Sequence, residues 1–405
     1  MNPCQNKKIV LGVTGSIAAY KAVEIASALT KRNAIVNSVL TPAAEKFISA
    51  LTFESVTGKP AFTDNSLWNG QNHVPHIELG HNADLVLIAP ASADTIARLA
   101  HGFGDNLLVL TVLASSCPIL LAPAMDADMY HNPITQENIE ILKKRGYGFI
   151  GPESGHLASG LEGLGRMSEP ADIVSQIELF LSRSGPLQGK HVVITAGGTQ
   201  EPIDPVRMIT NRSSGKQGYA VAQAALDAGA DVTLISAPTS LTAPCGSKTI
   251  NVRTAAEMKN AVLDQVKKAD CLIMCAAVAD FRPKIVSDQK MKKRDGFTSI
   301  EIENTEDILL NVGKSRENYP ELKMIIGFAA ESQNLIDNAI EKLSKKNIDM
   351  IVANDISSSV SGFGSDQNQA VFLFRDGTQK QVSLTDKYIL AEKIINEVIN
   401  HLTKE

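Results

Sequence analysis

The stretch Ala83-Asp-Leu-Val-Leu-Ile-Ala-Pro-Ala-Ser-Ala-Asp94 is nearly repeated later in the chain, as Ala269-Asp-Cys-Leu-Ile-Met-Cys-Ala-Ala-Val-Ala-Asp280. In each copy an Ala-Asp pair opens a short apolar run, and small residues with a second Ala-Asp pair close it. A strand buried in a parallel sheet reads as such a continuous apolar run. The two copies therefore predict two similar parallel sheets, one in each half of the chain.

Each half also has an earlier apolar run that ends in glycine, Ile9-Val-Leu-Gly-Val-Thr-Gly15 and His191-Val-Val-Ile-Thr-Ala-Gly197-Gly198. Further apolar runs alternate with segments of helical periodicity. We expect strands at 35–40, 118–122, 231–236, 271–276, 323–327 and 349–353, and helices at 17–31, 93–101, 133–145, 215–229, 254–268, 334–345 and 386–402. Thr41-Pro42 predicts a further helix start, and Asp376-Gly377 predicts a hairpin. This alternation predicts an α/β protein with two Rossmann-like, doubly wound parallel-sheet domains.

The length of the chain predicts two domains. A chain of 405 residues is too long for one ordinary core. The segment from Ser182 to Lys190 is short, polar and rich in turn formers, which is typical of a linker. We therefore expect a first domain over 1–181, a linker over 182–190 and a second domain over 191–405.

Charge and hydropathy exclude some classes of function. The net charge of −5 argues against binding to nucleic acid or to a membrane surface, which requires a basic face. No apolar run approaches the ~18 residues of a membrane-spanning helix. The five cysteines show neither a disulfide framework nor paired metal spacing, so we expect a cytoplasmic protein.

Candidate ligand-binding residues cluster after the predicted strands of the first half. In an open α/β sheet, ligands bind at the carboxyl ends of the strands. Hydroxyl groups there donate to phosphates, although each is also a typical helix cap. The absence of a G-x-G-x-x-G motif disfavours an ordinary NAD site. The candidates for cofactor binding are Gly15, Ser16, Ile17, Thr41, Ser92, Asp94 and Thr95.

Both halves also contain longer motifs, which are specific enough to be compared with known protein families. The first half contains His76-Ile-Glu-Leu79, Ala89-Pro-Ala-Ser-Ala-Asp-Thr-Ile-Ala97, Pro123-Ala-Met-Asp-Ala-Asp-Met-Tyr130 and Ala158-Ser-Gly-Leu-Glu-Gly-Leu-Gly-Arg-Met167. It resembles the homo-oligomeric flavin-containing cysteine decarboxylases. The second half, with Thr195-Ala-Gly-Gly-Thr-Gln-Glu-Pro-Ile-Asp-Pro-Val-Arg-Met-Ile-Thr-Asn-Arg-Ser-Ser-Gly-Lys216, is similar to phosphopantothenate–cysteine ligases. In this order the two halves resemble the bifunctional bacterial proteins of coenzyme A biosynthesis over essentially the whole chain.

For the first half, the resemblance implies FMN-dependent decarboxylation of 4′-phosphopantothenoyl-cysteine to 4′-phosphopantetheine. Oxidation of the neighbouring thiol supplies the electron sink that the departing carboxylate needs. The resemblance implies catalytic roles for His76 and Ser159, and substrate contacts for Met125, Asp126 and Arg166. Two positions depart from the family pattern: Asp126 replaces an asparagine, and Ser159 replaces a cysteine that donates a proton. A serine hydroxyl is a much weaker acid than a thiol with its pKa of ~8.5.

For the second half, the resemblance implies that 4′-phosphopantothenate is activated by CTP as an acyl-cytidylate, which the amine of cysteine then attacks. Mg²⁺ and lysines offset the charge of the two approaching anions. The sequence itself indicates a nucleotide pocket, whereas CTP rather than ATP follows from the resemblance alone, and the metal ligands stay unassigned. Asn211 and Lys290 are the implied catalytic residues, and the implied substrate contacts are Gly197, Gly198, Arg207, Asp280, Thr305, Glu306, Asp307, Ile308, Phe328, Lys342 and Lys346.

Two alternatives stay open on the sequence alone. The changes at Asp126 and Ser159 also fit a ligase whose flavin domain is weakly active or serves as an oligomerisation scaffold. A regulatory flavoprotein is the other alternative, and the intact ligase motifs argue against it. The family implies a homo-oligomer in which trimeric flavin domains and dimeric ligase domains combine into a dodecamer.

Overall fold

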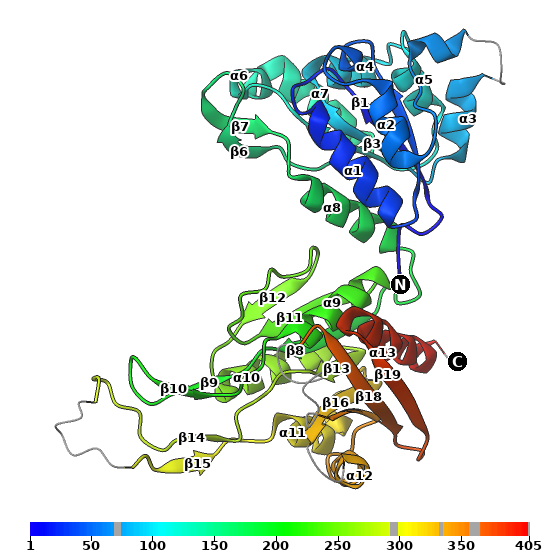
Figure 1. Ribbon diagram of the computed structural model, residues 1–405. Coiled ribbons are helices and arrows are strands. Elements are labelled where there is room, and N and C mark those ends of the chain that lie inside the picture. Colours follow the sequence, from blue (N-terminus) through cyan, green and yellow to red (C-terminus); the bar gives the residue numbers. More distant parts are fainter. Residues whose placement is uncertain (69–73, 292–298, 332–334, 356–364, 404–405) are drawn as a thin grey trace. The chain divides into compact units, whose positions relative to one another are not determined.

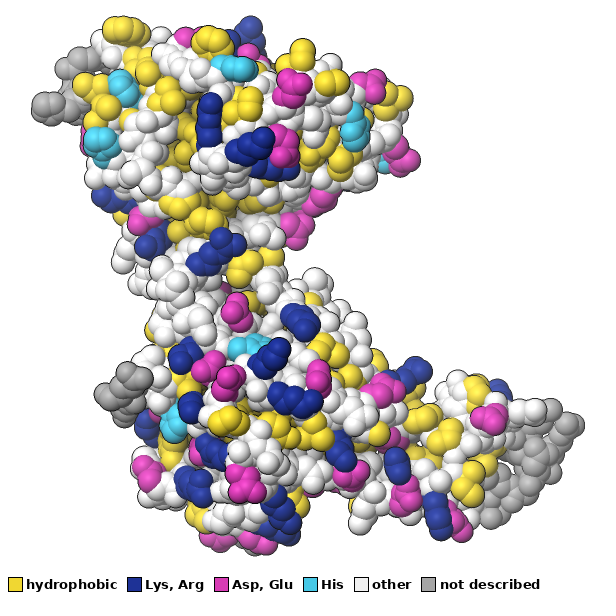
Figure 2. Space-filling model, turned by 180° about the vertical axis from the view of Figure 1, so that it is seen from behind, with side chains coloured by type: hydrophobic (Ala, Val, Ile, Leu, Met, Phe, Trp, Pro, Cys, Tyr) yellow, Lys and Arg dark blue, Asp and Glu magenta, His cyan; other side chains and the backbone are white. Residues whose placement is uncertain are grey.

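The computed structural model describes residues 1–68, 74–291, 299–331, 335–355 and 365–403 (Figure 1). The chain divides into two compact units: Asn2–Leu181, called the first unit below, and Ser182–Glu405 together with Met1, called the second unit. No described helix is both long and apolar enough to cross a membrane. On the face that Figure 2 shows, Lys and Arg side chains are interspersed with Asp and Glu, in line with the small net charge.

The first unit is a doubly wound parallel sheet. Its strands are β1 (Lys8–Val13), β2 (Ile35–Leu40), β3 (Leu85–Ala91), β4 (Ile119–Pro123) and β5 (Gly148–Phe149), in the spatial order β2-β1-β3-β4-β5. Alternate residues of β1 pack into separate apolar clusters on the two faces. The helices are α1 (Ala19–Lys31), α2 (Ala50–Thr57), α3 (Pro75–Asn82), α4 (Ala93–His101), α5 (Leu107–Ala114), α6 (Ala127–His131), α7 (Pro133–Lys144) and α8 (Pro170–Ser182). A hairpin of β6 (Glu153–His156) and β7 (Glu162–Arg166) completes the unit.

The second unit has an eight-stranded sheet with the order β12-β11-β8-β13-β16-β17-β18-β19. The first six strands in that order are parallel to one another. Strand β18 pairs antiparallel with β17 on one side and with β19 on the other, and β18 and β19 form the hairpin that Asp376-Gly377 predicts. The sheet strands are β8 (His191–Ala196), β11 (Asp231–Ser236), β12 (Lys248–Asn251), β13 (Cys271–Met274), β16 (Met324–Glu331), β17 (Met350–Asp355), β18 (Gln367–Phe374) and β19 (Gln379–Asp386). The helices are α9 (Lys216–Asp227), α10 (Ala255–Gln265), α11 (Ile308–Lys314), α12 (Leu335–Lys345) and α13 (Lys387–Leu402).

Two small sheets extend from the second unit. They pair β9 (Gln200–Pro202) with β10 (Met208–Thr210) and β14 (Phe281–Pro283) with β15 (Ile302–Asn304). Figure 1 shows these strands as an arm beside the large sheet, and we call them the arm. The predicted α/β class with two doubly wound sheets is confirmed. The strand orders differ: the second unit has the Rossmann order over its parallel strands, whereas the first has the flavodoxin-like order.

The repeated segments occupy equivalent places in the two sheets. The Asp84 Oδ2 atom accepts the N–H of Lys8 at 2.7 Å, and the Asp270 Oδ2 atom accepts the N–H of His191 at 2.9 Å. The Ala-Asp pair that opens each repeat therefore anchors the first residue of the neighbouring strand, β1 or β8. At the other end of these strands, the hydroxyl of Thr14 or Thr195 accepts a backbone N–H from the corner that follows β3 or β13.

Some local predictions are wrong at element ends. Thr41-Pro42 starts no α-helix; a short 3-10 turn at Ala44–Lys46 follows instead, because the Thr41 hydroxyl bonds the N–H of Ala44 and closes a tight turn. The strand expected at 271–276 ends at Met274, because the N–H of Ala276 bonds the side-chain hydroxyl of Thr195 on the neighbouring strand β8 instead of a backbone carbonyl. Within the segment expected as a linker, Leu187 is fully buried, so part of that segment packs into the second unit.

Candidate active sites

The first unit has a cavity of about 570 Å³ where β1, β3 and β4 end. This is the point at which the strand order reverses, which is where doubly wound sheets bind ligands. The tip of the β6–β7 hairpin contributes one wall. The cavity brings together several residues that the sequence predicts, namely Gly15, Ser16, Ile17, Ser92, Met125, Asp126, Ser159 and Arg166.

The two residues that depart from the family pattern contact each other in this cavity. The Ser159 hydroxyl donates a 2.6 Å hydrogen bond to Asp126 Oδ2. Asp126 is also the N-cap of α6, where its Oδ1 atom accepts the N–H of Asp128 at 3.1 Å. Both bonds lower the pKa of Asp126, and the bond from Ser159 has the larger effect. The carboxylate is therefore ionised at neutral pH. The hairpin tip is thereby tied to the start of α6.

Four predicted residues of the first unit are absent from the residues that line this cavity: Thr41, His76, Asp94 and Thr95. Thr95 is 4% exposed, and its N–H donates to the hydroxyl of Ser92, the N-cap of α4, at 3.3 Å. Asp94 pairs instead with Arg98 at 2.9 Å. These two residues therefore have helix-capping and ion-pair roles in this structure.

His76 lies on α3, a helix that packs against α5. Its Nδ1 atom is buried and has no hydrogen-bond partner among the residues that the structure describes. The large apolar side chains Trp68, Val74 and Ile77 nearby in the chain are 86%, 51% and 39% exposed. The predicted catalytic histidine thus sits beside an exposed apolar surface and apart from the cavity of its own unit.

Lys21 is a lining residue of this cavity that the sequence did not suggest. It projects from α1 and is only 7% exposed. Its Nζ atom lies 3.0 Å from Glu169, which also pairs with Arg166. The bond from Lys21 lowers the pKa of Glu169. One lysine in an apolar helical pattern gives no sequence signal for such a position.

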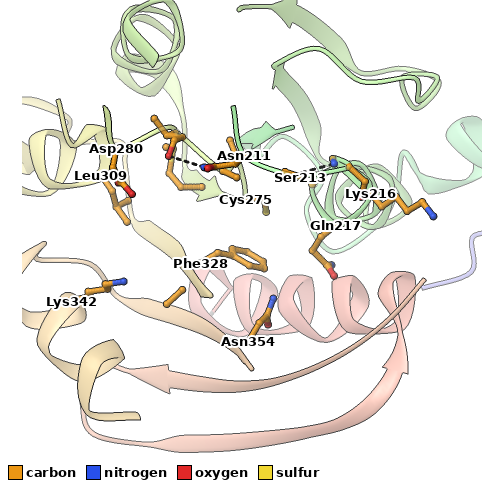
Figure 3. A pocket seen from close by; sticks show the side chains of 18 of the residues that line it. Asn211, Ser213, Lys216, Gln217, Cys275, Asp280, Leu309, Phe328, Lys342 and Asn354 are labelled. Carbon is orange, nitrogen blue, oxygen red and sulfur yellow. Dashed lines mark hydrogen bonds between the residues drawn. The ribbon is translucent and has the colours of Figure 1, made fainter. Parts of the chain in front are cut away.

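The second unit has a cavity of about 490 Å³ where β13, β16 and β17 end, beside the start of α9 (Figure 3). It lies at the reversal of strand order between β8 and β13. Predicted residues from well-separated parts of the chain converge here: Asn211, Asp280, Thr305, Glu306, Asp307, Phe328, Lys342 and Lys346.

Cations and carboxylates share one end of this cavity. The Lys346 Nζ atom lies 2.9 Å from Asp307, which also caps α11 through the N–H of Leu310. Asp280 and Lys342 line the same region. This arrangement can hold a polyphosphate with a divalent cation, since Mg²⁺ is typically bound by one or two carboxylates together with substrate phosphates.

Other predicted residues of the second unit lie outside the lining: Gly197, Gly198, Arg207, Lys290 and Ile308. Gly197 has φ +82°, and a Cβ there would lie 2.8 Å from the Ala237 carbonyl. The glycine pair therefore lets two backbone segments approach each other. Ile308 is 2% exposed and begins α11 inside the core.

Arg207 meets the segment of Lys290 at the buried carboxylate of Asp204. The Asp204 Oδ2 atom accepts from the Arg207 guanidinium at 2.6 Å and from the N–H of Met291 at 3.2 Å. The Arg207 bond, with the backbone N–H bonds, holds the pKa of Asp204 well below its ordinary value. Asp204 therefore positions both predicted residues, a role that sequence reasoning missed although Asp204 and Arg207 stand three residues apart.

Several lining residues of the second cavity were not predicted: Ser213, Ser214, Lys216, Gln217, Cys275, Asn354, Asn368 and Lys387. Asn354 follows the apolar run of β17 directly, a position at a strand end that could have indicated it. Burial, with a contribution from Lys216, lowers the pKa of Lys387. Burial raises the pKa of the Cys275 thiol, which therefore stays protonated at neutral pH.

Two family models match the chain, one over each unit. Residues 2–182 match the family model described as "Flavoprotein". Residues 187–402 match the model described as "DNA/pantothenate metabolism flavoprotein C-terminal domain". A crystal structure of the C-terminal domain of a coenzyme A biosynthesis bifunctional protein CoaBC is 39% identical to this chain, with a TM-score of 0.47, and covers 55% of this chain and 100% of that one.

Curated relatives match along nearly the whole chain. The coenzyme A biosynthesis bifunctional protein CoaBC of Bacillus subtilis is 43% identical over 396 residues, which are 97% of each chain. The protein of the same name from Vibrio cholerae is 46% identical over 400 residues, 98% of each chain. The resemblance predicted from the motifs is therefore confirmed. The chain belongs to the CoaBC family of bifunctional coenzyme A biosynthesis enzymes, which join a flavoprotein decarboxylase of phosphopantothenoylcysteine to a phosphopantothenate–cysteine ligase.

Proposed function

We propose that this protein is a cytoplasmic enzyme that carries out two consecutive reactions with FMN in the first unit and CTP with Mg²⁺ in the second. The 4′-phosphopantothenate carboxylate attacks the α-phosphorus of CTP, which releases pyrophosphate and forms an acyl-cytidylate. The amine of cysteine displaces CMP, and the first unit then decarboxylates the resulting 4′-phosphopantothenoyl-cysteine. The observation that carries the proposal is the presence of one cavity at the strand-order reversal of each sheet.

The cavity of the first unit fits FMN. Ile17, Ala18 and Met129 give it apolar walls suited to a flat ring system. Ser16 and Ser92 line it where α1 and α4 begin, and helix N-termini favour a phosphate. When bound, FMN supplies the reversible oxidation of the substrate thiol that makes the carboxylate a leaving group.

The chain's own residues would bind and orient the substrate in the first unit. Arg166 offers a cation to the substrate, and Met125 offers an apolar contact. The Ser159–Asp126 hydrogen bond would hold the hairpin tip over the reacting atoms. We assign Ser159 to proton transfer at that tip and His76 to proton transfer from α3 of a neighbouring copy, because His76 lies outside the cavity of its own unit.

The second unit would offset the charge of two anions. We assign Lys342 and Lys346 to the nucleotide, and Asp280 and Asp307 to Mg²⁺ on its phosphates. Phe328 gives an apolar surface to the nucleoside. We assign Asn211, whose amide donates to the Val278 carbonyl at 3.3 Å, to binding of the acyl-cytidylate. Lys290 would reach the site from an exposed position, as the family resemblance implies.

Exposed apolar side chains support a homo-oligomer. The arm of the second unit and the chain segments next to its strands carry exposed apolar side chains, between 44% and 78% exposed: Val206, Met208, Phe281, Ile285 and Ile302. In the first unit, the apolar residues around His76 form a second such surface. Contacts through both surfaces are compatible with the dodecamer that the family implies.

Three measurements on the purified full chain test this proposal. We expect a yellow protein with an FMN spectrum, pyrophosphate release that requires 4′-phosphopantothenate and is faster with CTP than with ATP, and CO₂ release from 4′-phosphopantothenoyl-cysteine. A protein that binds FMN yet releases no CO₂ would contradict the assignment of the first unit. Equal rates with ATP and CTP would contradict the nucleotide assignment.

A further inference from the structure

Lys346, one of the two lysines assigned to the nucleotide, is held by both ends of α11. Its Nζ atom lies 2.9 Å from the carboxylate of Asp307, the N-cap of this helix. Its backbone carbonyl lies against Gly313 near the end of the same helix, so closely that a Cβ atom at Gly313 would overlap the carbonyl oxygen. Lys346 and Asp307 both line the cavity of the second unit. The position of this ammonium group therefore depends on how α11 packs against the end of α12.

Asn347 ends α12 directly after Lys346. Its φ of +53° lies in the left-handed region, which asparagine adopts more readily than most residues with a side chain. The N–H of Asn347 bonds the Ser344 carbonyl, and the N–H of Ile348 bonds the Leu343 carbonyl. This pair of bonds is the Schellman pattern of a helix end. The backbone around Lys346 therefore has one defined conformation.

The side chain of Asn347 adds two bonds that a helix end does not require. Its Nδ2 atom donates to the Gly313 carbonyl at 2.9 Å, and its Oδ1 atom accepts from the Arg375 guanidinium at 2.7 Å. Arg375 belongs to the turn between β18 and β19. Glycine, which has no side chain, is the usual residue at this place in a helix end. The amide of Asn347 therefore does more than end α12: it ties the segment after Lys346 to α11 and to the β18–β19 hairpin.

We propose that Asn347 and Gly313 are positioning residues for nucleotide binding, which act by fixing the backbone of Lys346. The proposal rests on the proposed function, in which Lys346 binds the nucleotide. A binding group has to be held to within a fraction of an ångström, and a displacement of about 1 Å weakens its contact with the ligand. Neither Asn347 nor Gly313 lines the cavity, so both act through the lysine.

Gly313→Ala tests the contact from the side of α11. The added methyl group has to displace the Lys346 carbonyl, because the obstructing atom is backbone and not a flexible side chain. We expect the KM for CTP in pyrophosphate release to rise about tenfold, with kcat and the KM for cysteine unchanged. Gly185→Ala is the matched control: a Cβ atom there would overlap the Ala228 carbonyl, in the second unit but outside the cavity. It should lower the Tm and leave the KM for CTP unchanged.

Asn347→Gly is the milder variant, because glycine keeps the left-handed backbone and loses only the two side-chain bonds. We expect the KM for CTP to rise several-fold with little change in Tm. Asn33→Gly is its matched control. Asn33 has a φ of +59° and follows α1 in the first unit with the same pattern of backbone hydrogen bonds. This variant should leave the KM for CTP unchanged.

A double variant tests whether the two residues act through the lysine. Lys346→Gln alone should raise the KM for CTP, and the addition of Gly313→Ala should raise it no further. A merely structural role would reduce the amount of folded protein, and with it kcat, without a change in KM. Equal effects of Gly313→Ala in the presence and absence of Lys346 would overturn the proposal, as would an unchanged KM for CTP in Asn347→Gly.

Failure of the proposed function gives a different result. An unchanged KM for CTP in Lys346→Gln would refute the assignment of that lysine to the nucleotide, and the positioning role with it. A wild-type protein that releases no pyrophosphate would refute the proposed function as a whole. In that case calorimetric titration with CTP and Mg²⁺ compares wild type with Asn347→Gly. A weaker affinity in the variant supports the positioning role, and equal affinities overturn it.

Discussion

Ser159 and Asp126 are joined by a 2.6 Å hydrogen bond in which the serine hydroxyl donates to the carboxylate. The bond joins the tip of the β6–β7 hairpin to the N-cap of α6, two elements that face each other across the cavity. The proton of the Ser159 hydroxyl therefore points to Asp126, and the carboxylate remains ionised because this bond lowers its pKa. The two departures from the family pattern thus act as one unit.

Asp126→Asn should lower the KM for 4′-phosphopantothenoyl-cysteine about tenfold. An ionised Asp126 repels the substrate carboxylate, whereas the neutral amide of asparagine can donate a hydrogen bond to it. In asparagine the amide oxygen can take the capping place of Oδ1, and the NH2 group in the place of Oδ2 can donate to the Ser159 hydroxyl oxygen, so the hairpin should stay in place. The measurement is CO₂ release as a function of substrate concentration. Asp128→Asn, an exposed neighbour outside the cavity, is the control, and an unchanged or higher KM in Asp126→Asn would refute the repulsion.

Asp204→Asn should lower the Tm of the protein by several degrees at neutral pH. The ionised carboxylate holds Arg207 and the N–H of Met291, and the Asp204 side chain is almost fully buried. The pKa of Asp204 is depressed, so its contribution is complete above the ordinary aspartate pKa of 3.8 and is lost as the pH falls through the lower folded value. The difference in Tm between wild type and variant should therefore be constant from about pH 5 to 8 and shrink toward pH 3. A difference that grows on acidification would contradict this account.

Lys342→Gln should raise the KM for the nucleotide at least tenfold and leave decarboxylation unchanged. The lost cation is one of two that line the end of the cavity assigned to the phosphates, and a charge-assisted hydrogen bond is typically worth ~1.5–3 kcal/mol. Pyrophosphate release at varied CTP measures the effect. Lys393→Gln on α13, an exposed lysine that lines neither this cavity nor the pocket adjoining it, is the control. Similar changes in both variants would point to general electrostatics instead of a specific contact.

The sequence predicts the architecture well because buried strands and the turns after them have local signatures. The repeated segments 83–94 and 269–280 become β3 with its corner and β13 with its corner, each beside the first strand of its sheet. The spatial order of the strands in the first unit, β2-β1-β3-β4-β5, was not predictable in this way. A local pattern marks a strand, but it does not show on which side of β1 the next strand is added.

The candidate sites were predictable only where a residue follows a strand or belongs to a long motif. Gln217, Asn368 and Lys387 come from a helix turn, an antiparallel strand and the start of the last helix, and they meet only after the sheet has formed. The hydrogen bond of Ser159 with Asp126 joins residues 33 positions apart, so no local pattern indicates it. His76 shows the opposite case: its motif is clear, yet the fold of one copy leaves it away from the cavity.

Thr14→Val and Thr195→Val should each impair one activity and spare the other. Each threonine hydroxyl is at most 1% exposed and accepts a backbone N–H from the corner that lines its cavity, Ser92 in the first unit at 3.0 Å and Ala276 in the second at 3.1 Å. Valine has the same shape without the hydroxyl, so that N–H loses its partner at a cost of about 1–2 kcal/mol. We expect Thr14→Val to weaken flavin retention and CO₂ release several-fold, and Thr195→Val to raise the KM for the nucleotide by a similar factor. The other activity of each variant is its internal control, and loss of both activities in either variant would show general unfolding instead of a displaced corner.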